Sequence, residues 1–252
     1  MPIIQSVERA LQILNLFDEQ TTELKITEIS KRMNLHKSTV HSLLKTLEAY
    51  RYIKQDEESG KYRLGMALFE RGNLLLQTMD VRSVARKYLL ELSAQTGQTV
   101  NLVILDGNEG VYIDKVEGPK AAIRYSRIGR RIPLHCSAVG KALGAYLKQE
   151  ELMTLLQNYR YERRTPQTID NEADFLRELA AVREQGVAYD REENEPGVRC
   201  AAVPVRDHTG QVVAAVSLSM LVSGVDDHMF EGYVRLLKQT AADISAHMGY
   251  KS

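Results

Sequence analysis

The sequence predicts an α+β protein of two domains. The N-terminal domain is expected to be a winged helix-turn-helix (all-α with a β-wing), and the larger C-terminal domain to hold a mostly antiparallel sheet covered by helices. Apolar residues recur at helical spacing through the first 50 positions, and two short strand-like segments around a polar turn follow them. From position 81 onward, strand-like and helix-like segments alternate, with hairpin turns between strands.

The N-terminal segment predicts three helices. Apolar residues within 7–14 recur at i, i+3, i+4 and i+7, and Ser6 precedes them as a candidate N-cap. A second, short helix is expected to begin with Thr27 as its N-cap and to end at a tight turn at 34–35. A third helix is expected over about 37–50. Two short helices separated by so few residues are typical of a helix-turn-helix.

A two-stranded wing is expected directly after the third helix. Residues 52–54 and 61–64 predict the strands, and the polar turn 56–60 ends in glycine. Residues 65–77, rich in Leu and Met, predict a linker helix that packs against a partner subunit. The expected boundaries are 1–64 for the winged helix-turn-helix, 65–79 for the linker helix and 80–252 for the C-terminal domain.

The C-terminal region predicts strands joined by hairpins, with helices between them. Asp106-Gly107-Asn108 is the clearest hairpin turn. The expected strands are 100–105, 110–116, 121–127, 199–206 and 212–219. The expected helices are 82–96, 138–147, 149–158, 172–185 and 226–248. This order indicates an antiparallel sheet with helical layers.

Composition excludes several classes of protein. The chain has 252 residues, 33 basic and 33 acidic, so its formal net charge is zero. The two cysteines, Cys136 and Cys200, have no zinc-ligand spacing and predict no disulfide framework. No signal peptide and no apolar run of about 20 residues is found, which predicts a cytoplasmic protein that does not enter a membrane. No cofactor and no metal are expected.

Basic residues gather where a helix-turn-helix would meet DNA. Residues 27–54 hold six basic and two acidic side chains, a surplus of four in a neutral chain. Cationic side chains beside a duplex release counterions, and short hydroxyls let a helix approach phosphates and base edges. Residues 36–46 are therefore expected in the major groove, with the wing on the backbone or minor groove. The candidate DNA-binding residues are Lys37, Ser38, Thr39, His41, Ser42, Lys45, Lys61 and Arg63.

A second candidate site lies in the C-terminal domain. Small residues open the helix at 138–140, where free backbone N–H groups suit a small carboxylate. Ser217 and Ser219 share one face of a strand, Cys200 begins the neighbouring strand, and Asp190 precedes it. Buried hydroxyls need partners, and a ligand can be one. A satisfied structural network and close packing of small residues remain equal alternatives at this point.

His135, Cys136 and Cys200 raise two alternatives to a regulator, a thiol enzyme and a metal site. His135 beside Cys136 suggests a thiol nucleophile, but adjacent strand residues point to opposite faces, and a lone cysteine is usually a small buried apolar residue. A metal held by His135, Cys136 and Cys200 lacks ligand spacing. Because neither a thiol nucleophile nor a metal site is supported, the chain is expected not to be an enzyme. A third alternative, an adaptor built on a winged helix, would not bind duplex DNA.

Several motifs in order give the chain a family resemblance. The N-terminal motifs are 6–14, 37–47 and the wing sequence 60–65. The C-terminal motifs are Tyr125 through Arg131, Pro133 through Lys141 and Glu192 through Cys200. Over nearly its full length the chain resembles the IclR family of bacterial regulators. The resemblance implies a GAF-like α/β effector-binding domain and a homodimer or homotetramer on palindromic operators.

The resemblance also implies effector contacts. The family's contacts fall on Ala138, Val139 and the neighbouring Gly140, and on Asp190, Cys200, Ser217 and Ser219. Its apolar pocket wall falls on Ala121, Arg124, Ile132 and Val198. Arg124 stands where that wall can be apolar, which favours a more polar or acidic ligand. Ser42 stands where many members have Arg, so base readout should differ there.

The run 126–131 is similar to that of members controlling sugar-acid breakdown. Together these inferences predict a transcriptional regulator, most simply a repressor, controlled by a small carboxylate or sugar-acid effector of a catabolic pathway.

Overall fold

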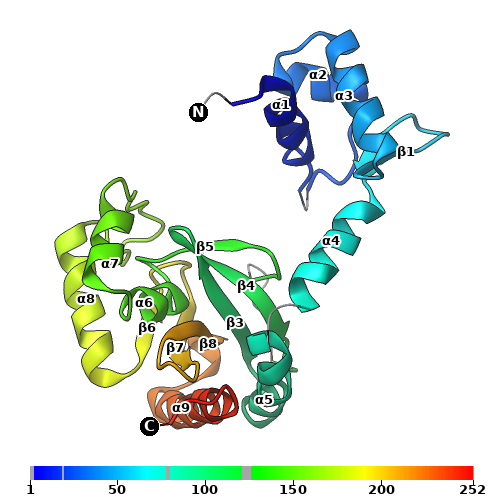
Figure 1. Cartoon of the computed structure of the whole chain (residues 1–252). Helices are drawn as coiled ribbons and strands as arrows, with labels where there is room; N and C mark the ends of the chain where they lie inside the picture. The colour runs from blue at the N-terminus through cyan, green and yellow to red at the C-terminus, as the bar shows by residue number, and fades with distance from the viewer. Residues whose placement is uncertain (1–2, 19, 78–79, 121–125, 252) are drawn as a thin grey trace. The chain divides into compact units, whose positions relative to one another are not determined.

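The structure of the protein is a computed structural model, and it describes residues 3–18, 20–77, 80–120 and 126–251. The chain divides into two compact units, Met1–Thr78 and Met79–Ser252 (Figure 1). The N-terminal unit packs around one hydrophobic cluster, and the C-terminal unit around two. Each unit therefore has a core of its own.

Three helices enclose the core of the N-terminal unit: α1 (Gln5–Leu14), α2 (Ile26–Met33) and α3 (Lys37–Ala49). Ile13, Ile29 and Leu44, one from each helix, are fully buried against one another in a single cluster. Asn34 adopts φ 51° and ends α2, which makes the tight turn into α3. The helix-turn-helix expected from the sequence is confirmed.

The wing is a two-stranded antiparallel hairpin of β1 (Ile53–Gln55) and β2 (Tyr62–Leu64). The Asp56 carboxylate accepts the Ser59 N–H at 2.8 Å, and Gly60 at φ +66° closes the turn. Tyr62 also exchanges two backbone hydrogen bonds with Leu24, at 2.8 and 3.0 Å. These bonds fix the wing to the segment that leads into α2.

The linker helix α4 (Met66–Gln77) begins in tight contact with the backbone that follows α3. The Gly65 N–H donates to the Tyr52 carbonyl at 2.8 Å, and the Ala67 N–H donates to the Arg51 carbonyl at 3.1 Å. A Cβ on Gly65 would lie 2.2 Å from the Arg51 carbonyl oxygen. Only glycine permits this close approach, so the first turn of α4 is held to the N-terminal unit.

The C-terminal unit holds a six-stranded sheet in the order β5-β4-β3-β8-β7-β6, with every neighbouring pair antiparallel. The strands are β3 (Thr99–Asp106), β4 (Glu109–Val116), β5 (Arg131–Pro133), β6 (Ala188–Arg191), β7 (Val198–Arg206) and β8 (Val212–Leu221). The central pair, β3 and β8, joins segments more than 100 positions apart in the chain.

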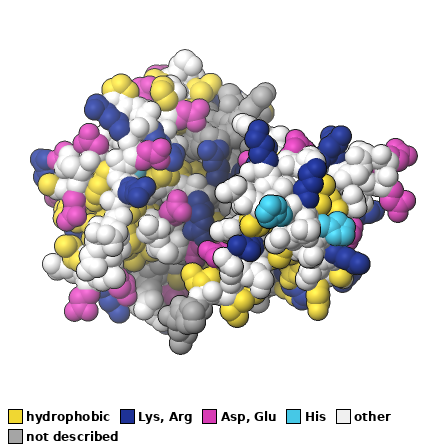
Figure 2. Space-filling model, turned by 90° about the horizontal axis from the view of Figure 1, so that it is seen from above, with side chains coloured by type: hydrophobic (Ala, Val, Ile, Leu, Met, Phe, Trp, Pro, Cys, Tyr) yellow, Lys and Arg dark blue, Asp and Glu magenta, His cyan; other side chains and the backbone are white. Residues whose placement is uncertain are grey.

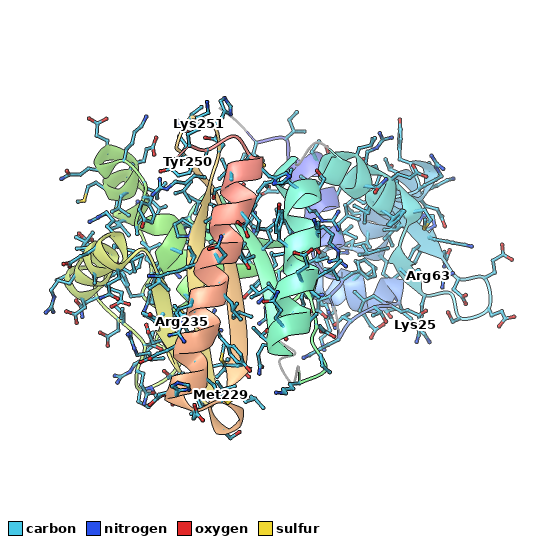
Figure 3. All side chains as sticks on the ribbon, turned by 90° about the horizontal axis from the view of Figure 1, so that it is seen from below. Lys25, Arg63, Met229, Arg235, Tyr250 and Lys251 are labelled. Carbon is cyan, nitrogen blue, oxygen red and sulfur yellow. The ribbon has the colours of Figure 1, made fainter. Side chains whose placement is uncertain are left out.

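Helices cover both faces of this sheet. On one face lie α5 (Asp80–Thr96) and α9 (Asp227–His247), which run side by side in Figure 3, where Met229 and Arg235 mark α9. On the other face lie α6 (Ala138–Gly144), α7 (Gln149–Leu156) and α8 (Glu172–Gln185). A 3-10 turn, Val222–Gly224, precedes α9. Alternate residues of β3 and β8 enter the two cores, so each strand contributes to both.

Several expectations about individual elements are wrong. Ile4 is the N-cap of α1 and Lys25 that of α2, so Ser6 and Thr27 lie inside the helices. The Glu28 carboxylate accepts the Lys25 N–H at 2.7 Å, which is why α2 starts earlier than expected.

The sheet also differs from the expected one at its edges. Of the expected strand 121–127, residues 121–125 lie outside the described residues, and 126 and 127 are not in a strand. The short edge strands β5 and β6 were not expected, because three or four residues carry too little alternation to predict a strand.

Candidate functional site

One face of α3 is free of the N-terminal core. Val40, Leu44 and Leu47 are buried on the inner side, whereas the outer side is polar and basic. Figure 2 shows histidine (cyan) and Lys or Arg side chains (dark blue) gathered on the exposed surface of this unit. Among the expected DNA-binding residues of α3, Thr39 is half-buried, and Lys37, Ser38, His41, Ser42 and Lys45 are exposed.

Two hydroxyls on this face are held by hydrogen bonds to backbone carbonyls of the preceding turn. Ser42 Oγ donates to the Ser38 carbonyl at 3.1 Å, and Thr46 Oγ1 donates to the Ser42 carbonyl at 3.0 Å. Since the Ser42 proton is used within the helix, its exposed oxygen is available as a hydrogen-bond acceptor. That geometry suits an amino group on a base edge.

The wing presents positive charge at its base and negative charge at its tip. Arg63, labelled in Figure 3, is exposed, whereas Lys61 forms a 3.5 Å ion pair with Glu23. The turn residues 56–58 carry three carboxyl groups, which a phosphate would repel. Lys25, also labelled, is exposed at the start of α2. Lys25 was not predicted as a DNA contact, because it lies two residues before the basic segment 27–54.

In the C-terminal unit, a row of polar side chains crosses four neighbouring strands. Thr99 of β3 pairs with Ser219 of β8, Ser219 with Cys200 of β7, and Cys200 with Asp190 of β6. Directly opposed residues in a sheet lie on the same face, so these four side chains line up on one side. Asn101 pairs with Ser217 in the adjacent row of the same face. The structure thus brings together Asp190, Cys200, Ser217 and Ser219, as the sequence analysis expects.

Hydrogen bonds link this polar cluster. Asn101 Nδ2 donates to Ser217 Oγ at 3.4 Å and to Ser219 Oγ at 3.3 Å, and Cys200 Sγ lies 3.2 Å from Ser219 Oγ. Within the described part of the chain, Asn101 Oδ1 and Thr99 Oγ1 have no hydrogen-bond partner, although their residues are 1% and 0% exposed. Neither residue was predicted to belong to the site, although Thr99 and Asn101 are polar at alternate positions of an otherwise apolar strand.

The apolar side of this site is built around α6. Ile132, Ala138, Val139 and Val198 are buried in the same cluster as Cys200. The Ser137 hydroxyl caps α6 by accepting the Gly140 N–H at 3.1 Å, so this amide already has a partner. Two expected wall residues, Ala121 and Arg124, lie outside the described residues.

Asp190 closes one end of the row. Its Oδ1 accepts the Glu193 N–H at 2.8 Å and the Asn194 N–H at 3.3 Å. Burial is the largest cause that raises the pKa of this carboxyl, to about 7, and the nearby Glu193 charge adds to it. A carboxyl that is partly protonated at neutral pH can donate a hydrogen bond as well as accept one.

A buried cation lies behind Asp190. The Lys141 side chain is 0% exposed, and its Nζ donates to Glu193 Oε1 at 2.7 Å, to the Tyr189 carbonyl at 2.8 Å and to Glu178 Oε1 at 3.1 Å. Lys141 thereby connects α6 to α8 and to the loop after β6. This network was not predicted from the sequence, because a lysine in a helix is ordinarily a surface residue.

The thiol and metal alternatives do not match this geometry. His135 faces Tyr159 OH at 3.0 Å through Nδ1 and the Glu162 carbonyl at 3.1 Å through Nε2, whereas Cys136 lies 3.9 Å from Asn194 Oδ1. Burial raises the pKa of the Cys136 thiol to about 12, so it is not a thiolate at neutral pH. Among the described residues, no group of three potential ligands could hold a metal ion.

We expect Asp190→Asn to remove a pH dependence from stability. The carboxyl pKa rises from 3.8 to about 7 on folding. The group therefore stabilises the fold fully below pH about 4, and this contribution is lost as the pH rises to about 7. The largest possible loss is about 4 kcal/mol, from roughly three pKa units at 1.36 kcal/mol each. Relative to the wild type, the variant should gain stability between pH 4 and pH 8 in urea unfolding followed by circular dichroism.

Asp207→Asn is the matched control for this prediction. A hydrogen bond from the Thr209 hydroxyl is the main cause that lowers the Asp207 pKa below 3.8, so this carboxyl is ionised in both states above pH about 4. The stability of Asp207→Asn should therefore run parallel to that of the wild type between pH 4 and pH 8 and differ in its pH dependence only below that range. If the free energy of unfolding changed with pH in the same way in the wild type and in Asp190→Asn, the prediction would be contradicted.

The fold and the two sites define a class of protein: a DNA-binding transcriptional regulator with a separate ligand-binding domain. Models of the IclR helix-turn-helix domain and of the bacterial transcriptional regulator IclR C-terminal domain match residues 6–57 and 73–246, respectively. The chain belongs to the IclR family of transcriptional regulators, whose members are not enzymes. The α+β fold that the sequence predicts is confirmed.

Curated relatives span nearly the whole chain. It is 57% identical to the transcriptional regulator XynR of Escherichia coli, with 99% of each chain covered. It is 40% identical to the regulator KdgR of the same organism, over 98% of this chain and 94% of that protein. It is 34% identical to the transcriptional repressor AllR of E. coli, over 98% and 92%.

Solved structures of IclR proteins have the same fold as this chain. IclR of Thermotoga maritima superposes with a TM-score of 0.81 at 34% identity, over 97% of this chain and 99% of that one. An IclR homologue from Microbacterium hydrocarbonoxydans, complexed with 4-hydroxybenzoate, gives 0.84 at 25% identity, over 97% and 99%. In the described part of this chain, every helix is too short or too polar to cross a membrane.

Proposed function

We propose that this regulator is a repressor controlled by a small carboxylate, specifically a sugar acid from a catabolic pathway. The observation that carries the proposal is the buried polar row from Thr99 to Asp190, which has unsatisfied hydrogen-bonding capacity inside a domain joined to a basic helix-turn-helix. The relative AllR is named a repressor, and one similar structure holds a carboxylate, 4-hydroxybenzoate. Both facts support the proposal by analogy.

The N-terminal unit supplies DNA binding in this proposal. The exposed face of α3 enters the major groove, where Lys37 and Lys45 bind phosphate and His41 and Ser42 face base edges. Ser38 and Thr39 stand at the start of α3, close to the backbone. Arg63, and Lys61 once it separates from Glu23, contact the DNA backbone beside the groove. The protein acts as a homodimer or homotetramer on a palindromic operator in the cytoplasm.

The C-terminal unit binds the effector. Backbone amides of Ala138 and Val139 and the side chains of Ser217, Ser219 and Asp190 provide polar contacts. Gly140 allows α6 to approach the sheet closely, and Cys200, Ile132 and Val198 provide the apolar wall, together with Ala121. Arg124 adds a cationic group to that wall, which favours an acidic ligand. The effector changes DNA binding only to the extent that it binds one arrangement of the subunits more tightly than another.

The first experiment measures binding of the purified protein to its own upstream DNA at two salt concentrations, with and without sugar acids and 2-keto acids. We expect tight, salt-sensitive binding that one acid alters. Binding to no duplex under any condition would overturn the DNA-binding assignment and favour an adaptor. Turnover of an acid that is lost in Cys200→Ala would favour an enzyme.

Two substitutions should separate phosphate contacts from base readout. Lys45→Ala should weaken binding to all sequences about equally and lower the slope of log K against log salt by about 1. Ser42→Ala should instead relax the preference at one base position, by about 1 kcal/mol, because a single hydrogen bond is lost. Binding-site selection and salt titrations measure both effects. The control is Lys87→Ala, an exposed lysine of α5 with a side chain that is 75% exposed. Unchanged operator affinity in both α3 variants would refute the docking model.

A further inference from the structure

We infer that Thr99 and Asn101 determine the specificity of the effector site by binding hydroxyl groups of the effector, so that the ligand is a hydroxylated carboxylic acid rather than a plain one. This inference rests on the proposed function and names the residues of β3 that complete the site. Both residues lie on the face that α6 covers, in register with Ser219 and Ser217.

Asn101 has a hydrogen-bonding group left over. Its carboxamide has two N–H donors and one carbonyl acceptor. The two neighbouring serine oxygens accept the Nδ2 donors, at 3.3 and 3.4 Å, which leaves Oδ1 without a partner among the described residues. A buried carbonyl oxygen without a donor destabilises the ligand-free protein, and a ligand donor would remove that penalty.

Thr99 presents a second unsatisfied group in the same place. Its hydroxyl is fully buried and unpaired within the described part of the chain, and its strand partner is Ser219, to which Asn101 also donates. Two unsatisfied groups on alternate residues of one strand face thus flank the same serine. An isolated unpaired atom can be a packing defect, whereas two adjacent ones beside a polar row indicate a binding surface.

The chemistry of the two groups selects the ligand. An ionised carboxylate only accepts hydrogen bonds, so it cannot satisfy Asn101 Oδ1. A hydroxyl group donates to Asn101 and can also accept from Thr99. The row spans three inter-strand spacings of roughly 4.8 Å each, which exceeds the length of an extended acid of five or six carbons. Such an acid can place its hydroxyls along β3 and its carboxylate over the neighbouring strands β8 and β7.

The test uses pairs of acids that differ only in their hydroxyl groups. Isothermal titration of the full-length protein compares the stereoisomeric pentonates and hexonates with pentanoate and hexanoate. We expect one hydroxylated acid to bind at least about 100-fold more tightly than the unsubstituted acid of equal length, because a polar site rejects an analogue that leaves its groups unpaired.

Thr99→Val is the decisive variant because it keeps the shape of the side chain. It should weaken binding of the hydroxylated acid by about tenfold, since one hydrogen bond contributes about 1.4 kcal/mol. It should not lower the melting temperature of the ligand-free protein, because the hydroxyl has no partner to lose. Asn101→Leu should reduce the discrimination further, but it also removes one hydrogen-bond partner from each of two serines, so its stability must be measured alongside.

Thr96→Val is the matched control. The Thr96 hydroxyl is equally buried but donates to the Leu92 carbonyl at 2.8 Å. That variant should lower the melting temperature and leave discrimination unchanged.

Equal affinity of the wild type for both acids of a pair, or an unchanged affinity ratio in Thr99→Val and Asn101→Leu, would overturn the inference. If no acid binds while the operator is still bound, both this inference and the proposed effector class fail, and the DNA-binding assignment stands.

Discussion

Lys141→Met is expected to lower the free energy of unfolding of the C-terminal unit by about 3–5 kcal/mol, because it leaves a buried carboxylate without a counter-charge. In the wild type, Glu193 Oε1 lies 2.7 Å from Lys141 Nζ, and the Glu193 side chain is 7% exposed. The Tyr189 carbonyl loses a 2.8 Å hydrogen bond at the same time. The chain contains no tryptophan, so circular dichroism in urea is the suitable measurement.

A double variant distinguishes charge from packing in this network. Lys141→Met with Glu193→Gln removes both charges of the most deeply buried pair and leaves only Glu178, whose side chain is 25% exposed. This variant should regain much of the lost stability, since neutral groups of similar volume are tolerated where one unpaired buried charge is not. Lys238→Met is the control, because Lys238 donates to the Gln185 carbonyl from the surface. If Lys141→Met proved as stable as Lys238→Met, the buried network would not stabilise the fold.

Gly140→Ala should have an effect of comparable size, for a steric reason. A Cβ at this position would lie 2.4 Å from Leu134 Cα and 2.7 Å from the carbonyl oxygens of Leu134 and Pro133. These are backbone atoms, so α6 itself must move. We expect a loss of about 3 kcal/mol or more and a weakened effector response, because Ala138 and Val139 move with the helix.

Gly144→Ala supplies the comparison within the same helix. There the nearest atom to an added Cβ is Leu179 Cδ2 at 3.6 Å, an ordinary contact. Replacing a helical glycine with alanine should be neutral or stabilising by up to about 1 kcal/mol. Thermal unfolding of the two variants measures the difference. Equal melting temperatures would show that α6 accommodates the Gly140 clash.

Local patterns predicted the N-terminal unit well because its helices carry their periodicity in a few consecutive residues. Helix starts were less predictable. Ser6 and Thr27 are common N-cap types, but the bond between Glu28 and the Lys25 N–H places the start of α2 two residues earlier. The edge strands β5 and β6 escaped prediction because each contributes only three or four residues.

Some polar residues of the C-terminal site could be predicted from the sequence, and others could not. Ser217 and Ser219 show the two-residue spacing of one strand face, and the register confirms that they lie beside Asn101 and Thr99. The long-range pairing that adds Thr99 and Asn101 to this row has no local signature. Lys141 was missed for the same reason, since its partners come from α8 and the loop after β6.

The central pairing of β3 with β8 has a kinetic consequence. The row of polar residues takes Thr99 from one strand and Ser219 from the other, and these strands are separated by most of the C-terminal chain. Closing so long a loop is slow and comes late in folding, so an incompletely folded domain has no effector site. An effector that binds the assembled row should therefore slow global unfolding. Hydrogen exchange of the most slowly exchanging amides of β3 and β8 should then slow by the same factor in both strands.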